Sequence, residues 1–246
     1  MKLRELAEAF ARLEAGSRRL DAVRIVAGLF EKVSGTELEA VAYLLQGQLR
    51  PVYEGVELGL GERLLHRAVA RACDAGEAVV ARRFKRLGDL GLVAEVLTPK
   101  ARRPRLTVGD AYRDLLRIAA AGGSGSVERK TVLLAELLRR ATPIEARYLV
   151  RIVQGRLRLG VGDATLLEAA AAGALGSRAR KHLIEDAYNV RSDLGGVIRL
   201  AYARGARGLS RIGPKVGVPV RPELAQRLGS ARAIIARLGT VQAEPK

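Results

Sequence analysis

Residues that could bind a phosphate group gather in two glycine-rich stretches of this 246-residue chain. The second stretch contains Gly160 and Gly162, follows Arg156 and Arg158, and precedes an apolar run that predicts a helix. The unpaired backbone N–H groups at a helix start carry partial positive charge, and glycine lets an anion approach them closely. The sequence therefore predicts a phosphate-binding loop at this helix start.

A weaker form of the same pattern occurs earlier in the chain. Gly59 and Gly61 precede a predicted helix on which Arg63, Arg67 and Arg71 recur every four residues and so share one face. Such a row is often only a solvated helix face. Its position directly after the two glycines favours phosphate contact instead, although this stretch alone is a weak signal.

The Gly-Ser segment at residues 122–126 is a third candidate for anion binding. Gly125 precedes Ser126, which stands at a predicted N-cap, and the first turn of the next helix carries Arg129 and Lys130. Cations at a helix start oppose the helix dipole by a few tenths of a kcal/mol, which favours an external anion there. A plain flexible loop is the alternative.

The sequence lacks the residue patterns of common catalytic and metal sites. Paired carboxylates, a Ser/His/Asp set and a Walker-type loop are not evident. The single cysteine, Cys73, excludes an internal disulfide and a multi-cysteine metal site, and the two histidines have no metal-ligand spacing. We therefore predict no metal ligands in the chain.

The charge balance points to a polyanionic partner. The chain has 43 Lys and Arg against 26 Asp and Glu, a net charge of +17, which favours nucleic acid. An Arg-rich compositional bias is the alternative. No apolar run approaches the ~20 residues of a membrane span, and no signal peptide is visible. We expect a cytoplasmic, nucleoid-associated monomer with no membrane contact.

Helical periodicity dominates the chain up to about residue 204, so the predicted fold class is all-α. Leu, Val and Ala are plentiful and Trp is absent, which favours helix packing over sheets. A basic, proline-bounded stretch near residues 98–106 separates two predicted lobes, at about 1–97 and 107–204. Residues 205–222 are predicted to be an extended linker, and residues 223–246 are predicted to belong to a separate segment after it.

The two predicted lobes resemble divergent copies of one unit. Three motifs recur in the same order, at 46–49 and 154–157, 58–61 and 159–162, and 88–91 and 192–195. Three ordered matches favour an internal duplication and a pseudo-symmetric fold. The alternative is that these glycines only end helices.

Together these motifs resemble the N-terminal DNA-binding domain of ATP-dependent DNA ligases of the archaeal and eukaryotic type. The resemblance covers nearly the whole chain, and the loop at 154–162 is its most specific part. The segments that carry it are 44–47, 58–62, 123–126 with Arg129 and Lys130, 154–162, 187–188, 192–195, and 219–222 before 224–225.

The resemblance implies an all-helical domain that grips the minor groove around a nick through phosphate contacts. The full-length enzyme would act in replication, repair and recombination, use ATP and Mg²⁺, and carry adenylation and OB-fold domains as partners of this domain. This chain itself would need no cofactor. The expected DNA-binding residues are Gly59, Gly61, Arg63, Arg67, Gly125, Ser126, Arg129, Lys130, Arg156, Arg158, Gly160 and Gly162.

The last residues are similar to the start of the family's catalytic motif. Glu244, Pro245 and Lys246 match the position of the adenylated lysine, but the Asp-Gly that follows it in the family is absent from the sequence. Residues 223–246 would then begin a truncated adenylation domain. We expect double-stranded or nicked DNA binding without ligation. The alternative is a basic helical adaptor for RNA or a protein, which would not explain Glu-Pro-Lys.

Overall fold

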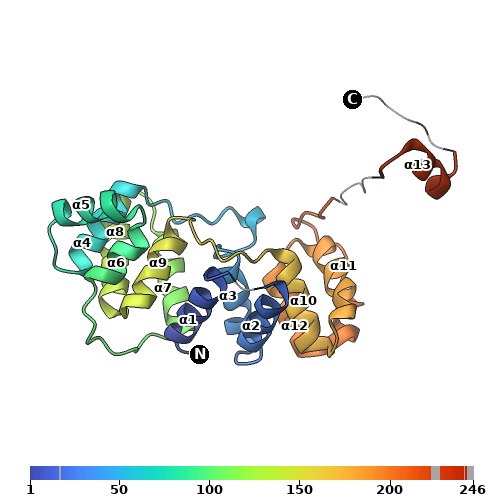
Figure 1. The fold of residues 1–246 in the computed structure, drawn as a ribbon, viewed down its shortest axis with the longest axis horizontal. Coiled ribbons are helices and arrows are strands. Elements are labelled where there is room, and N and C mark those ends of the chain that lie inside the picture. The colour runs from blue at the N-terminus through green and yellow to red at the C-terminus, as the bar shows by residue number, and fades with distance from the viewer. Residues whose placement is uncertain (17, 223–227, 241, 243–246) are drawn as a thin grey trace.

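The computed structural model describes residues 1–16, 18–222, 228–240 and 242. In these residues it contains 13 α-helices, two short 3-10 turns and no β-strand, which confirms the all-α prediction. Figure 1 shows an elongated molecule whose helices form two groups side by side. The last helix, α13 (Ala231–Leu238), buries none of its residues.

Apart from α13, the α-helices of the described residues fall into two sets of six that follow the same order. The first set is α1 (Leu3–Glu14), α2 (Arg19–Phe30), α3 (Gly35–Leu45), α4 (Glu62–Ala72), α5 (Glu77–Leu87) and α6 (Leu90–Leu97). The second set is α7 (Val108–Ala120), α8 (Ser126–Arg140), α9 (Pro143–Val153), α10 (Asp163–Leu175), α11 (Lys181–Arg191) and α12 (Leu194–Leu209). The 3-10 turns are η1 (Val52–Glu54) and η2 (Arg178–Arg180).

The helices do not group by their order in the sequence. Helices α2 and α3 pack on α10 and α12, whereas α8 and α9 pack on α4 and α6. Helices α1 and α7 contact each other between the two lobes. In Figure 1 one lobe, on the left, contains α4–α6 with α8 and α9, and the other contains α2 and α3 with α10–α12.

This exchange corrects the predicted lobes at 1–97 and 107–204, because each half of the chain contributes helices to both lobes. The chain crosses between the lobes along residues 46–61 and again along 154–162. The apolar faces of α2 and α3 are covered by helices of the second half, so one core cluster joins the two halves.

A short backbone pairing lies where α1 and α7 begin. The N–H of Leu3 donates to the carbonyl of Leu106 at 2.9 Å, and the N–H of Val108 donates to the carbonyl of Met1 at 3.0 Å. The two bonds are related by exchange of the first and second halves, as a pseudo-two-fold axis requires. This pairing fixes the starts of the two helix sets against each other.

The predicted repeat at 88–91 and 192–195 has the same structural role in both lobes. The carboxylate of Asp89 caps α6 by accepting from the N–H of Leu92 at 3.0 Å, and that of Asp193 caps α12 by accepting from the N–H of Gly196 at 2.9 Å. Such caps satisfy donors that a helix start leaves unpaired. The duplication inferred from the sequence is therefore present in the fold.

The capping aspartates also hold the helices that pack beside them. Asp89 accepts from the buried Arg151 of α9 at 2.6 Å, and Arg151 donates to Glu14 of α1 at 2.7 Å. Asp193 instead accepts from the hydroxyl of Tyr43 of α3 at 2.7 Å. Burial raises the pKa of Asp89, but hydrogen bonds from Arg151 and a backbone N–H outweigh it and leave that pKa below its usual range.

Candidate nucleic-acid interface

The two glycine-rich crossings lie side by side between the lobes. A Cβ atom added to Gly47 would lie 3.7 Å from Cβ of Leu157, and the Arg156 guanidinium lies 4.0 Å from the Glu62 carboxylate. An open groove between them is lined by residues 47–49, 56–61 and 152–155. The repeated motifs at 46–49 and 154–157 therefore face one another in space.

The first glycine stretch is fastened to the start of α8. Gly59 has a φ of 61°, which favours glycine, and Gly61 is the N-cap of α4. The Lys130 ammonium donates to the carbonyl of Leu58 at 2.8 Å. The structure thus brings Lys130 together with the predicted first loop, but one of its three donors holds the loop in place.

The Gly-Ser segment at residues 122–126 is bonded to the side chain of Arg129 in the helix that follows it. Gly125, with a φ of 71°, is the N-cap of α8, and Ser126 is the first helical residue, so the prediction that Ser126 is the cap is wrong. A left-handed cap residue suits glycine, which explains the shift by one position. Arg129 donates to the carbonyl of Gly122 rather than standing free.

The predicted basic stripe on α4 is largely neutralised by carboxylates of the same chain. Arg67 lies 3.3 Å from Glu77, and Arg71 lies 2.7 Å from Glu128. Arg63 is exposed and makes no ion pair with any residue that the structure describes. Of this stripe, Arg63 has the side chain best placed to bind an external anion.

The second glycine stretch keeps an unpaired cation. Arg158 is exposed and has no ion-pair partner among the described residues. Gly160 has a φ of 68°, whereas Gly162, the N-cap of α10, has a φ of −117° that any residue adopts. A Cβ atom at either glycine would meet nothing within 4 Å, so the backbone there is open to an approaching ligand.

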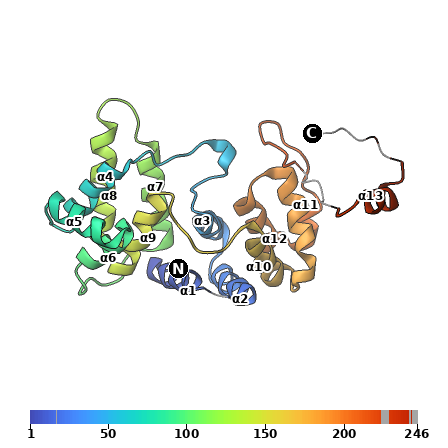
Figure 2. The same cartoon turned by 45° about the horizontal axis from the view of Figure 1, so that its top comes forward.

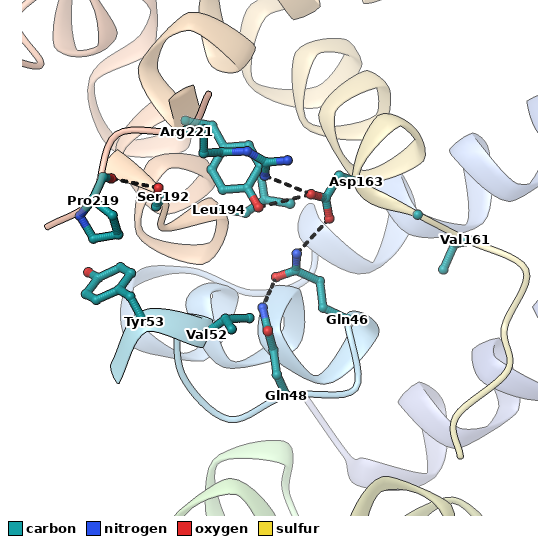
Figure 3. A pocket seen from close by; sticks show the side chains of 12 residues that line it. Gln46, Gln48, Val52, Tyr53, Val161, Asp163, Ser192, Leu194, Pro219 and Arg221 are labelled. Carbon is teal, nitrogen blue, oxygen red and sulfur yellow. Dashed lines mark hydrogen bonds and ion pairs between the residues drawn. The ribbon is translucent and has the colours of Figure 1, made fainter. Parts of the chain in front are cut away.

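A carboxylate of the chain itself occupies the start of α10. Asp163 accepts hydrogen bonds from the Gln46 amide at 2.8 Å, the Tyr188 hydroxyl at 3.0 Å and the Arg221 guanidinium at 3.0 Å (Figure 3). Burial and the Asp163 charge raise the pKa of Tyr188 to about 12, so its hydroxyl stays a donor. An external phosphate at this helix start would lie beside Asp163, whose charge Arg221 offsets.

Arg221 is a site residue that the sequence analysis missed, because residues 205–222 were assigned to an extended linker. Its guanidinium stacks over the Tyr188 ring at 4.0 Å from the centroid, and its backbone N–H donates to the carbonyl of Asn189 at 2.7 Å. The Ser192 hydroxyl donates to the carbonyl of Pro219 at 2.7 Å. The segment 219–221 therefore docks on α11 and is part of the helical domain.

An open pocket of about 630 Å³ lies beside this docked segment. Figure 3 shows its lining, which includes Gln46, Gln48, Tyr53, Gly162 and Arg221. The amides and hydroxyl supply hydrogen-bond donors next to the glycine crossing. The motif at 219–222 was visible in the sequence, but nothing local indicated which helix it would contact.

Three other expectations concern regions or ligands beyond these loops. Lys246 lies outside the described residues. Among the residues that the structure describes, no group of His, Cys, Asp and Glu side chains could hold a metal ion. None of the described helices combines the length and apolar character needed to cross a membrane.

Comparison with known proteins identifies the family to which the chain belongs. The profile of the family described as "DNA ligase N terminus" matches residues 2–171, which include both glycine crossings. The chain belongs to the DNA ligase N-terminal family. The match extends from α1 into α10, so the exchanged helices α2 and α3 and the crossings between the lobes all lie in the region by which this ligase family is defined.

Individual DNA ligases are similar over almost the whole chain. It is 41% identical to the DNA ligase of Sulfurisphaera tokodaii, 42% identical to that of Ignicoccus hospitalis and 39% identical to that of Saccharolobus solfataricus. Each alignment covers 97% of this chain but 42% of the relative. The chain therefore spans less than half the length of these ligases, and its similarity reaches past the docked segment at 219–221.

Proposed function

We propose that the chain binds duplex DNA without sequence preference, through phosphate contacts in the minor groove, as the DNA-binding part of an ATP-dependent DNA ligase. The observation that carries the proposal is that the two glycine crossings lie side by side along one groove, and that Arg63 and Arg158, next to their glycines in the chain, are exposed and have no ion-pair partner among the described residues. Phosphate contacts of this kind position a protein on DNA but carry no base information.

The symmetry of the helical domain supports a duplex rather than a single strand. The two crossings are related by the same pseudo-two-fold that relates α1 to α7. The two backbones of a DNA duplex are also related by two-fold axes, so equivalent loops can meet equivalent phosphates on opposite strands. A net charge of +17 adds a long-range attraction.

The proposed biological setting is nick sealing in replication, repair and recombination. ATP and Mg²⁺ would serve the adenylation and OB-fold domains of the full-length ligase rather than the helical residues. In that enzyme, Lys246 would hold the position of the lysine that accepts AMP. The helical domain would hold the nicked duplex while those domains act.

Titration against matched nucleic acids tests the proposal. Intact duplex DNA, the same duplex with one nick, and duplex RNA of the same length are each titrated at several salt concentrations. For about six neutralised phosphates, log K should fall against log salt with a slope near −5. We expect tighter binding to the nicked than to the intact DNA. A flat salt dependence, or a preference for RNA, would contradict the proposal and favour a basic adaptor.

A further inference from the structure

Four arginine side chains line one cavity beside α12. Arg191, Arg204, Arg207 and Arg211 surround an open space of about 410 Å³ against the apolar Leu200 and Ile212. We call this cavity the arginine pocket. No carboxylate lines it, and none of its four arginines makes an ion pair within the part of the chain that the structure describes.

The backbone around the arginine pocket is built by two glycines. Gly205 has a φ of 57° and a ψ of −155°, a conformation that is essentially confined to glycine, and α12 bends sharply there. Just after this bend the backbone lies close to the part of α12 before it: a Cβ atom added to Gly208 would lie 2.5 Å from Cβ of Arg204. These glycines allow Arg207 and Arg211 to converge on Arg204.

The helix dipole explains only part of this cluster. Arg191 ends α11 and Arg207 lies in the last turn of α12, where the helix dipole favours a cation. That effect does not require Arg204 and Arg211 in the same cavity. Four like charges repel one another unless an anion lies among them, and guanidinium groups bind phosphate oxygens in a bidentate manner.

A second cavity lies between the arginine pocket and the pocket beside the glycine crossing and shares lining residues with both. This second cavity shares Arg191, Leu200 and Ile212 with the arginine pocket and is also lined by Tyr53, Lys215 and Asp193, whose carboxylate caps α12. Tyr53 in turn lines the pocket beside Gly162. In Figure 2 the segment after α12 rises on the same side of the molecule as η1 and the loop between α7 and α8. One extended polyanion could therefore reach both places.

We infer that the arginine pocket binds the sugar-phosphate backbone of the duplex beyond the part held by the glycine crossings. This inference rests on the proposed DNA binding and extends its footprint across α12. Binding should therefore strengthen once a duplex is long enough to reach the pocket. Removing the arginines should abolish that gain without affecting short duplexes.

The test uses a variant with Arg204→Gln, Arg207→Gln and Arg211→Gln. The parent and this variant are titrated with a nested set of duplexes of increasing length at several salt concentrations. We expect equal affinity for the shortest duplexes and about ten- to hundredfold weaker binding of the variant to the longest. The salt slope on the longest duplex should be smaller by about two to three units, because each phosphate contact contributes about 0.9.

A second variant controls for the lost charge. Arg4→Gln, Arg24→Gln and Arg113→Gln remove three exposed arginines that pair with neighbouring carboxylates on α1, α2 and α7. Such pairs contribute little to stability. This control should retain the gain with duplex length.

The remaining outcomes decide between the inference and the proposed function. If the triple variant binds every duplex like the control, or loses affinity equally at all lengths, the extended footprint is overturned while DNA binding stands. If the parent binds no duplex, the proposed function and this inference both fail. If circular dichroism shows that the triple variant is unfolded, the same test is made with Arg211→Gln alone, because residue 211 lies outside the helices. An acidic peptide that displaces long DNA better than salt of equal ionic strength would also overturn the phosphate assignment.

Discussion

At the scale of single residues, the partners of each arginine indicate which ones can bind DNA. Arg67 already lies 3.3 Å from Glu77, whereas Arg158 has no partner in the described chain. We expect Arg158→Ala to weaken duplex binding by about 1–2 kcal/mol, as a lost charged hydrogen bond does, and to reduce the salt slope by about one unit. Arg67→Ala should change both much less. Titrations of the two folded variants would refute this if Arg67→Ala had the larger effect.

Gly162 offers a cleaner test of backbone approach than Gly160. Gly160 has a φ of 68°, so Gly160→Val would strain the fold and obscure any effect on binding. Gly162 has an ordinary φ and caps α10, where Asp and Ser are both favoured residues. Gly162→Asp should leave the melting temperature near that of the parent but weaken DNA binding at least tenfold, because its charge repels phosphate.

Gly162→Ser is the matched control for that substitution. It provides a similar helix cap without the charge, and it should bind DNA far better than Gly162→Asp. Thermal unfolding and DNA titration of both variants check the prediction. Equal binding by the Ser and Asp variants would mean that no phosphate approaches this helix start.

At the scale of elements, the docked segment 219–221 is coupled to the start of α10 through Asp163. Arg221 neutralises a carboxylate that would otherwise repel DNA. Arg221→Gln should therefore weaken DNA binding several-fold. In an Asp163→Asn background the same substitution should have little effect, because no charge is left to neutralise. A double-mutant cycle measures this coupling, and additive effects would show instead that Arg221 contacts DNA directly.

The ion pairs of Arg151 in α9 with Asp89 and Glu14 should make the stability of the fold depend on pH in the acid range. The pKa values of Asp89 and Glu14 are lowered in the folded chain because, although burial raises them, hydrogen bonds from Arg151 and other donors dominate. The unfolded chain then binds protons at a higher pH than the folded chain. The stabilisation that these two carboxylates provide should be complete above about pH 5. The free energy of unfolding should then decrease as the pH drops through 4 towards 3.

Asp89→Asn is the control for that pH dependence. Asparagine retains the helix cap but not the charge, so Arg151 loses one of its two carboxylate partners. This variant should be less stable than the parent at neutral pH and lose less stability on acidification. Denaturant unfolding across this pH range provides the measurement, and parallel curves for the two proteins would contradict the assignment.

Most elements could be predicted from the sequence, but their pairing could not. Helical periodicity predicted the all-helical chain up to about residue 204, because this signal is local, whereas the cap predicted at Ser126 was wrong by one position. Local sequence does not determine which helix covers α3. Helices α6 and α12 both begin with the same motif, so either could pack there. Arg221 was missed for the same reason, since its partners Asp163 and Tyr188 are distant in sequence.

At the scale of the whole molecule, the exchange of helices predicts how the chain responds to cleavage. A protease site placed at residues 99–105, between the two sets of helices, should allow a single cut that leaves the fold intact. The two fragments should coelute on size exclusion and unfold in one transition, because each lobe contains helices of both. Either fragment alone should lack the circular dichroism of a folded helical protein. Independent folding of one fragment would contradict this.

The crossed connections also bear on how such a protein could arise. A chain of half this length, with one glycine crossing, would build the same two lobes as a homodimer in which each subunit lends its leading helices to the other. Fusion of the two genes would release the copies from identical sequence. The two lobes could then diverge in sequence. In one lobe Arg151 donates to Asp89, and in the other Tyr43 donates to Asp193.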